Sequence, residues 1–219
     1  MRKYLMAALL CMVMLVAMVP SAFAATNYEE CMAGIAQQKA VQAQASANAN
    51  ALRKQGYSDS SAKIQAAKAT WNQAQAKIED YQNLSKYTWD DIRILTTTVY
   101  YEAGQTTEQL RQYVARVALN RVEDSRFPNS VYEVITQRGQ YNTKYATVEA
   151  ANTIKAQDAA NGTKNWNHCK WSVMEAMRGN TDMPKNVLYQ ANFTQGNGLW
   201  QSVYFNSGWF ASTSYFCYG

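Results

Sequence analysis

The sequence has few of the side chains that metal chemistry needs. Its 219 residues include one histidine, His168, and its four cysteines form no Cys-x-x-Cys motif. A zinc site takes its ligands from histidine, cysteine and carboxylate groups at characteristic spacings. We therefore expect neither a metal ion nor another cofactor. His168 lies near Trp166 and Trp171 and is expected to be a packing or surface residue.

Long apolar runs are also scarce, and the one long run stands at the N-terminus. Arg2 and Lys3 precede it, Tyr4 to Val19 form it, and Ala22-Phe23-Ala24 provides a small-x-small cleavage site. This pattern is typical of a secretory signal peptide, whereas a membrane-spanning helix needs roughly 20 apolar residues. We predict that residues 1–24 are a signal peptide and that no membrane anchor remains after its removal.

Charge of either sign is low. Loss of the signal peptide lowers the formal net charge from +5 to about +3. This excess suits retention near an anionic cell envelope, and it is equally compatible with ordinary surface charge. We expect no nucleic-acid partner.

Three cysteines remain after export, because Cys11 leaves with the signal peptide. An exported protein can keep a disulfide bond. Cys169 and Cys217 both lie in the C-terminal part of the chain and are the candidate pair, whereas Cys31 lies in a different kind of sequence. The alternative is three unpaired buried thiols.

Proline is absent from Thr26 to about Leu84, where the chain is rich in Ala, Gln, Asn and Lys, a composition that favours helix. Apolar side chains recur there at intervals of three and four residues, as in a heptad seam: Ile64, Ala67, Trp71, Ala74, Ile78 and Tyr81. We predict a helical hairpin or coiled coil over residues 25–86. It could be a spacer or brace, or a module that binds the wall or a protein partner.

From Tyr87 onward aromatic residues are frequent, and Gly and Pro punctuate the sequence. Thr88 and Asp91 predict a capping-box start to a helix, and Gly104 predicts a left-handed stop. Further helices are expected from Thr106 or Thr107 to about 124, then over 130–137, 147–160 and 165–178. Strands are expected over 187–193, 199–205 and 213–218. The prediction is an α+β domain over residues 87–219 with a small antiparallel sheet.

Glu102 is the candidate catalytic residue. It lies seven residues after Leu95 and three after Val99, so helical spacing places it on the apolar face. Desolvation and the negative end of the helix dipole would both raise its pKa, as an acid catalyst requires. Spacing alone favours the simpler alternative, in which Glu102 pairs with Arg116 or Arg121.

Four blocks of sequence occur in an order and at separations that resemble the spore cortex-lytic, SleB-type cell wall hydrolases. They are Val99-Tyr100-Tyr101-Glu102-Ala103-Gly104, residues 114–122, residues 125–131, and Gly139-Gln140-Tyr141. Residues 188–192 and 213–216 also look like the terminal strands of that family. The resemblance runs from about Thr88 to the C-terminus and leaves out the helical hairpin.

The resemblance implies a lysozyme-like helical catalytic domain whose essential acid is Glu102. It also implies cleavage of peptidoglycan glycan strands between N-acetylmuramic acid and N-acetylglucosamine, in the manner of a lytic transglycosylase. Together with the predicted signal peptide, this places the protein outside the cell, in the cell wall or spore envelope of a bacterium. Gln140, Tyr141 and Tyr189 match blocks that face the cleft and are the expected sugar contacts. Residues 104–108 depart from the family pattern, which leaves the role of Glu108 open.

Other functions remain open at this point. The chain could be a peptidoglycan hydrolase of another bond class, such as a glucosaminidase or an amidase. It could also be a wall-binding protein without activity, or an envelope assembly protein in which the hairpin is the working part. An amidase usually needs zinc ligands or a Cys/His pair, for which a single histidine is a weak basis.

Overall fold

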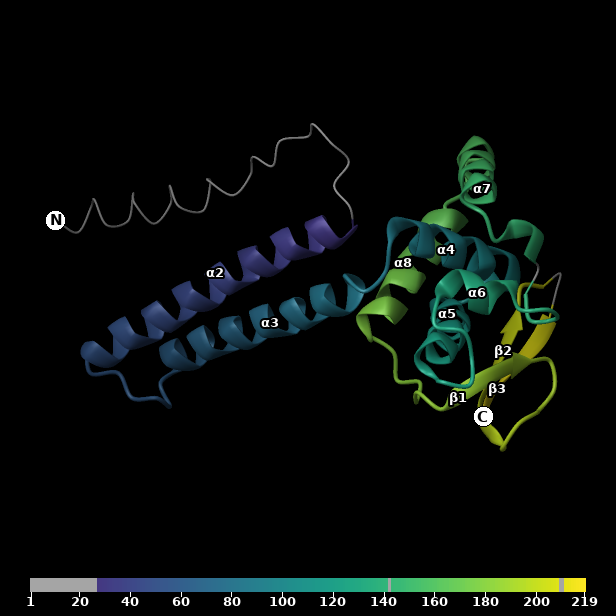
Figure 1. The fold of residues 1–219 in the computed structure, drawn as a ribbon. Helices are drawn as coiled ribbons and strands as arrows, with labels where there is room; N and C mark the ends of the chain where they lie inside the picture. Colours follow the sequence, from purple (N-terminus) through teal and green to yellow (C-terminus); the bar gives the residue numbers. More distant parts are fainter. Residues whose placement is uncertain (1–26, 142, 209–210) are drawn as a thin grey trace.

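A computed structural model of the protein describes residues 27–141, 143–208 and 211–219. The predicted signal peptide, residues 1–24, lies outside the described residues. Within the described residues, no helix combines the length and the apolar character needed to cross a membrane. A long helical hairpin leads into a helical domain with a small sheet, as Figure 1 shows.

The hairpin consists of α2 (Asn27–Lys54) and α3 (Ala62–Leu84), which lie side by side along most of their length (Figure 1). The predicted seam is buried at Ile64, Ala67, Ala74 and Ile78. The prediction is wrong for Trp71, which is 39% exposed. At the end nearest the domain, the ring of Tyr81 lies over Gly34 so closely that a Cβ there would come within 2.5 Å of the ring. Small side chains therefore let the two helices approach.

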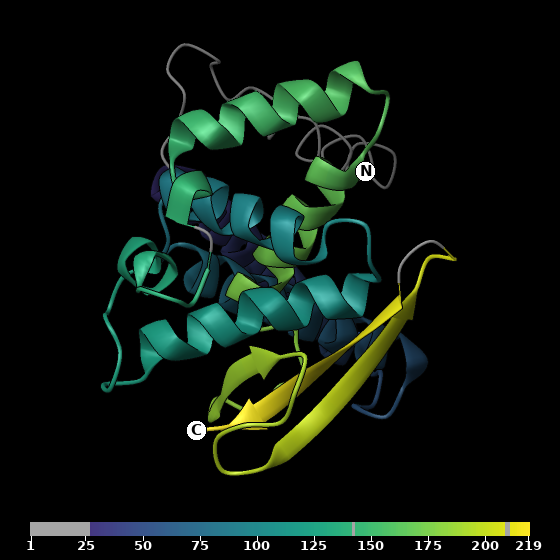
Figure 2. The ribbon, with the colours of Figure 1, turned by 90° about the vertical axis from the view of Figure 1, so that its right-hand side faces the viewer.

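The domain is built around α5 (Glu108–Glu123), which is buried along most of its length. It packs against α8 (Asn165–Arg178) on one side and against the first strand on the other. Around it lie α4 (Trp89–Ala103), α6 (Val131–Thr136), the short 3-10 helix η1 (Thr143–Tyr145) and α7 (Val148–Ala160), arranged as in Figure 2.

Local capping explains where several of these helices begin and end. The predicted capping box is present: the Thr88 side chain accepts from the Asp91 backbone N–H, and Asp91 accepts from the Thr88 backbone N–H. Gly179 ends α8 in the left-handed conformation, with φ of 91°. The predicted left-handed stop at Gly104 is wrong, because its φ is −56°. Its N–H donates to the Tyr100 carbonyl at 3.0 Å, so the helical geometry continues through this residue.

The sheet contains β1 (Val187–Ala191), β2 (Leu199–Asn206) and β3 (Ala211–Tyr218) in the order β1-β3-β2, with both pairings antiparallel. The register sets Gln190 opposite Phe216 and Ser202 opposite Tyr215. Helices followed by a small antiparallel sheet confirm the predicted α+β fold.

The predicted disulfide between Cys169 and Cys217 is wrong in this structure, because the described cysteines are all buried free thiols. Cys169 lies on α8 and Cys217 on β3, and α5 packs between α8 and the sheet. The Cys217 sulfur instead accepts a hydrogen bond from the Gln195 backbone N–H at 3.5 Å. The two thiols thus belong to different layers of the core.

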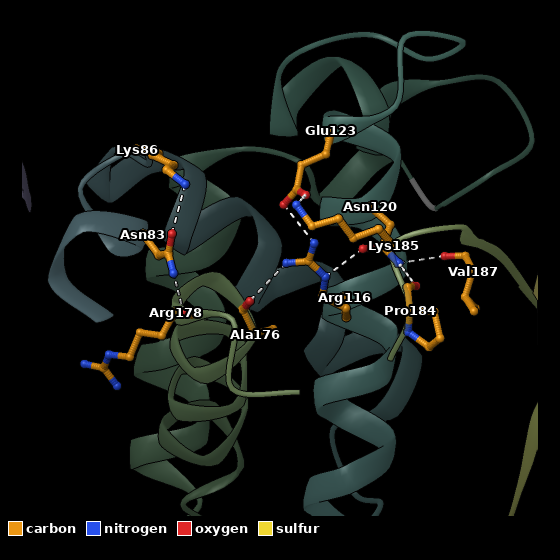
Figure 3. Close-up of polar contacts among 10 residues, drawn as sticks. All are labelled: Asn83, Lys86, Arg116, Asn120, Glu123, Ala176, Arg178, Pro184, Lys185 and Val187. Carbon is orange, nitrogen blue, oxygen red and sulfur yellow. Dashed lines mark hydrogen bonds and ion pairs between the residues drawn. The ribbon is translucent and has the colours of Figure 1, made fainter. Parts of the chain in front are cut away.

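Two asparagine side chains attach the hairpin to the domain. The Asn83 amide donates to the Arg178 carbonyl at 2.8 Å and its oxygen accepts from Lys86, as Figure 3 shows. The buried Asn27 amide donates to the carbonyls of Leu84 and Tyr87 at 2.8 and 2.7 Å. The start of α2 is thereby tied to the end of α3 and to the segment that leads into α4.

Replacing Asn27 should loosen this attachment. Asn27→Ala leaves two carbonyl groups without their donor, which should lower the free energy of unfolding by about 1–3 kcal/mol. Asn48→Ala, at an exposed position of the same helix, is the matched control and should be close to neutral. Urea unfolding of both variants checks this. Equal stability of the two would contradict the role given to Asn27.

Candidate active site

A pocket of about 260 Å³ opens between the end of α4, the helix α5, the segment before η1 and the sheet. Its described lining is Glu102, Thr106, Leu110, Arg121, Gln140, Tyr141, Gln190, Ala191, Asn192, Phe205, Ser212, Thr213 and Ser214. Among these residues Glu102 is the one carboxylic acid and Arg121 the one cation. The rest of the wall is mostly hydroxyl, amide and aromatic groups, which suit a neutral polar ligand.

Glu102 projects into this pocket from the last turn of α4. Val99 and Leu95, one and two turns earlier, are fully buried. The prediction that Glu102 shares their burial is wrong: its side chain is exposed, because the last turn of α4 reaches the edge of the core. Protein atoms nevertheless surround the carboxyl group in the concave wall, and this partial desolvation raises the pKa of Glu102 above its usual value.

The alternative in which Glu102 pairs with an arginine is not what the structure shows. Arg116 instead forms an ion pair with Glu123 at 2.8 Å and donates to Asn120 (Figure 3). Within the described residues, the ion pairs of the protein do not include Glu102. The carboxyl group therefore keeps its proton more readily than a salt-bridged glutamate would.

Arg121 is a buried cation in the pocket wall, with 3% of its surface exposed. Its Nε donates to the Leu188 carbonyl at 2.7 Å, and its Nη1 donates to the side-chain oxygen of Gln140. The guanidinium also lies against the rings of Phe127 and Tyr189, 5.3 and 5.6 Å from their centroids. Because Arg121 occupies the oxygen of Gln140, the amide nitrogen of Gln140 is the group left for a ligand.

Tyr141 links the acid and the cation electrostatically. The pKa of its hydroxyl is raised to about 12, mainly by burial, while the Arg121 charge lowers this pKa and the nearby Glu102 charge raises it. The hydroxyl is therefore neutral at physiological pH and able to donate a hydrogen bond. A neutral donor beside Glu102 is suited to a sugar hydroxyl or to the carboxylate that forms when Glu102 loses its proton.

Two of the three predicted sugar contacts line the pocket. Gln140 and Tyr141 belong to the wall, whereas Tyr189 is not among the lining residues and its ring packs against Arg121. Glu108 also lies outside the lining, exposed in the first turn of α5, where it accepts from Gln112.

Sequence reasoning missed the sheet side of the pocket, formed by Gln190, Asn192 and the stretch Ser212 to Ser214. Alternation along the strands was the available signal, because it separates the two faces of a sheet. It does not say which face meets Glu102, since that depends on how the sheet packs against α5.

Within the described residues, no group of three or more His, Cys, Asp or Glu side chains has a geometry that could hold a metal ion.

Comparison with known proteins gives one family match. Residues 105–212, just under half of the chain, match the family described as cell wall hydrolase. The match begins three residues after Glu102 and includes Arg121, Gln140 and Tyr141. Comparison with curated proteins and with solved structures gives no match.

Glu102→Gln should fold normally and be at least as stable as the wild type at neutral pH. A pKa raised by folding means that the protonated form favours the folded state and that this contribution is lost as pH rises through the folded pKa. Above that pH the carboxylate opposes folding, and an amide does not.

Thermal unfolding at about pH 4 and pH 7 measures this effect. The melting temperature of the variant minus that of the wild type should be larger at pH 7 than at pH 4. If this difference is instead smaller at pH 7 than at pH 4, the carboxylate stabilises the folded protein.

Proposed function

We propose, from the match of residues 105–212 to the cell wall hydrolase family, that the protein is an exported enzyme that cleaves the glycan strand of peptidoglycan. The bond cleaved is the one between N-acetylmuramic acid and N-acetylglucosamine, and the reaction is that of a lytic transglycosylase. Glu102 serves first as the general acid and then as the general base.

The observation that carries this proposal is that Glu102 is the one carboxylic acid among the described residues of the pocket wall. Ordinary retaining and inverting glycosidases place two carboxyl groups across the scissile bond, roughly 5 to 9.5 Å apart. A transglycosylase needs one, because the attacking group belongs to the substrate. A single carboxyl group with a raised pKa fits the second reaction.

The reaction balances with this one group. Glu102 gives its proton to the glycosidic oxygen as the bond from that oxygen to C1 of the muramic acid breaks. N-acetylglucosamine then leaves with a free 4-hydroxyl. The muramic acid 6-hydroxyl attacks C1 and returns its proton to the Glu102 carboxylate, which leaves a 1,6-anhydro end. No water is consumed, and Glu102 ends the cycle protonated.

The surrounding side chains suit the binding and orientation of the sugars. The Gln140 amide nitrogen can donate to an N-acetyl carbonyl, because Arg121 holds the other end of that amide. The neutral Tyr141 hydroxyl can donate to the Glu102 carboxylate while the 6-hydroxyl attacks. Ser212 and Ser214 on β3 add hydroxyl groups on the opposite wall.

Glu102→Gln should abolish cleavage, because the amide keeps the shape of the side chain and has no proton to give. A positioned acid contributes about 10²- to 10⁴-fold, so release of glycan fragments should fall by at least that factor. Glu108→Gln, which changes the exposed carboxyl group six residues later, is the matched control and should retain activity. Loss of activity in both variants, or in neither, contradicts the assignment.

The pH dependence should show the same group. Because Glu102 must begin protonated, kcat/KM should fall as pH rises through its pKa. Burial raises that pKa, so the fall should lie above the value of about 4.3 of an ordinary glutamate. Rates on purified peptidoglycan over a pH series check this. A rate that increases through that range would assign Glu102 the role of an initial base instead.

A further inference from the structure

A second groove, of about 370 Å³, lies beside the candidate active site, between the end of α4, η1 and α7. In Figure 2, α7 runs across α4 on the side of the domain away from the sheet. The volume falls within the range of roughly 300–1,000 Å³ typical of small-molecule sites. Nothing in the proposed mechanism uses this groove.

One wall of the groove is a stacked pair of tyrosines. The rings of Tyr101 and Tyr145 have centroids 3.8 Å apart and planes inclined by 19°. Tyr101 is 45% exposed, and the Tyr100 ring meets its ring edge-on at 5.8 Å. Ring contacts on two sides hold Tyr101 in place before any ligand arrives. A fixed aromatic surface binds with little loss of side-chain entropy.

The other wall is one face of α7. Ala150, Ile154 and Gln157 are spaced by four and three residues, so they lie above one another on the helix. Ile154 is buried and gives an apolar floor, while Gln157 and Thr153 are exposed and give an amide and a hydroxyl. The groove thus combines an aromatic wall, an apolar floor and neutral hydrogen-bonding groups, and its lining also includes the charged residues Lys144 and Glu149.

This combination matches the surface of a pyranose ring. The two faces of such a ring carry C–H groups, which suit the electron-rich face of a tyrosine. Its rim carries hydroxyl and N-acetyl groups, which can bond to both ends of a glutamine amide. The N-acetyl methyl group adds an apolar part for a floor such as Ile154.

The groove adjoins the acid pocket through two segments of chain. Tyr101 and Glu102 are consecutive residues, whose Cα atoms lie about 3.8 Å apart. Tyr141 lines the acid pocket, and Tyr145 lines the groove four residues later. A glycan polymer bound across Glu102 is longer than the pocket of about 260 Å³, so its further sugar units need a binding surface outside that pocket.

We propose that this groove is a subsite for an N-acetylhexosamine unit of the glycan strand, away from the bond that is cleaved. Tyr101 supplies the stacking surface and Gln157 the amide. The inference rests on the proposed function, since it takes the ligand of the groove to be another part of the same substrate.

The subsite can be tested by calorimetry, which measures binding of an N-acetylglucosamine hexamer to the full-length protein. The protein carries Glu102→Gln so that the hexamer is not cleaved. Adding Tyr101→Ala or Gln157→Ala should weaken binding about two- to ten-fold, whereas Tyr101→Phe should bind as before because it keeps the ring. Tyr132→Ala, which removes a tyrosine that is 53% exposed on α6, is the control and should have no effect. Circular dichroism confirms that each variant is folded.

The outcomes separate the subsite from the function. If Tyr101→Ala and Gln157→Ala both bind the hexamer as tightly as the parent, the subsite is wrong, even where the wild-type protein cleaves peptidoglycan. If the groove prefers a peptidoglycan stem peptide to the hexamer, the ligand class is wrong. If the wild type cleaves no glycan but both variants weaken hexamer binding, the proposed function fails and the subsite stands.

Discussion

The hydrogen bonds of the buried Arg121 guanidinium hold the candidate active site together. One bond reaches the Leu188 carbonyl on β1 and another reaches Gln140 before η1, so a side chain of α5 connects the sheet to the segment that carries Tyr141. A buried cation is costly unless its donors are satisfied. The geometry that satisfies Arg121 is also the geometry that brings the walls of the pocket together.

This arrangement places a cation near Glu102 without pairing the two. An ion pair would lower the pKa of Glu102 and make it a poor acid. Here Arg121 is occupied by a carbonyl and an amide oxygen, and the pKa of Glu102 is raised by desolvation. Tyr141 responds to both charges and stays neutral. One protonated carboxyl group and neutral donors around it are what the proposed intramolecular reaction requires.

Local sequence signals predicted much of this structure. They failed for features that are determined by the packing of distant segments against one another. The Thr88 and Asp91 cap and the hairpin seam at Ile64 and Ile78 depend on nearby residues, and both are present. Helical spacing predicts that position 102 lies on a buried face, but the Glu102 side chain is exposed while its neighbour Ala103 is buried. The side of β3 that meets Glu102 is set by contacts between distant segments. The same is true of the separation of Cys169 from Cys217.

The central claim is that one carboxyl group suffices because the attacking hydroxyl comes from the substrate. Digestion of purified peptidoglycan in ¹⁸O-labelled water, followed by mass spectrometry of the released fragments, tests this most directly. Intramolecular attack predicts 1,6-anhydro-muramic ends that carry no label. Reducing muramic ends that contain ¹⁸O would show that water attacks instead and would contradict the account. New amino termini would contradict the assigned bond as well.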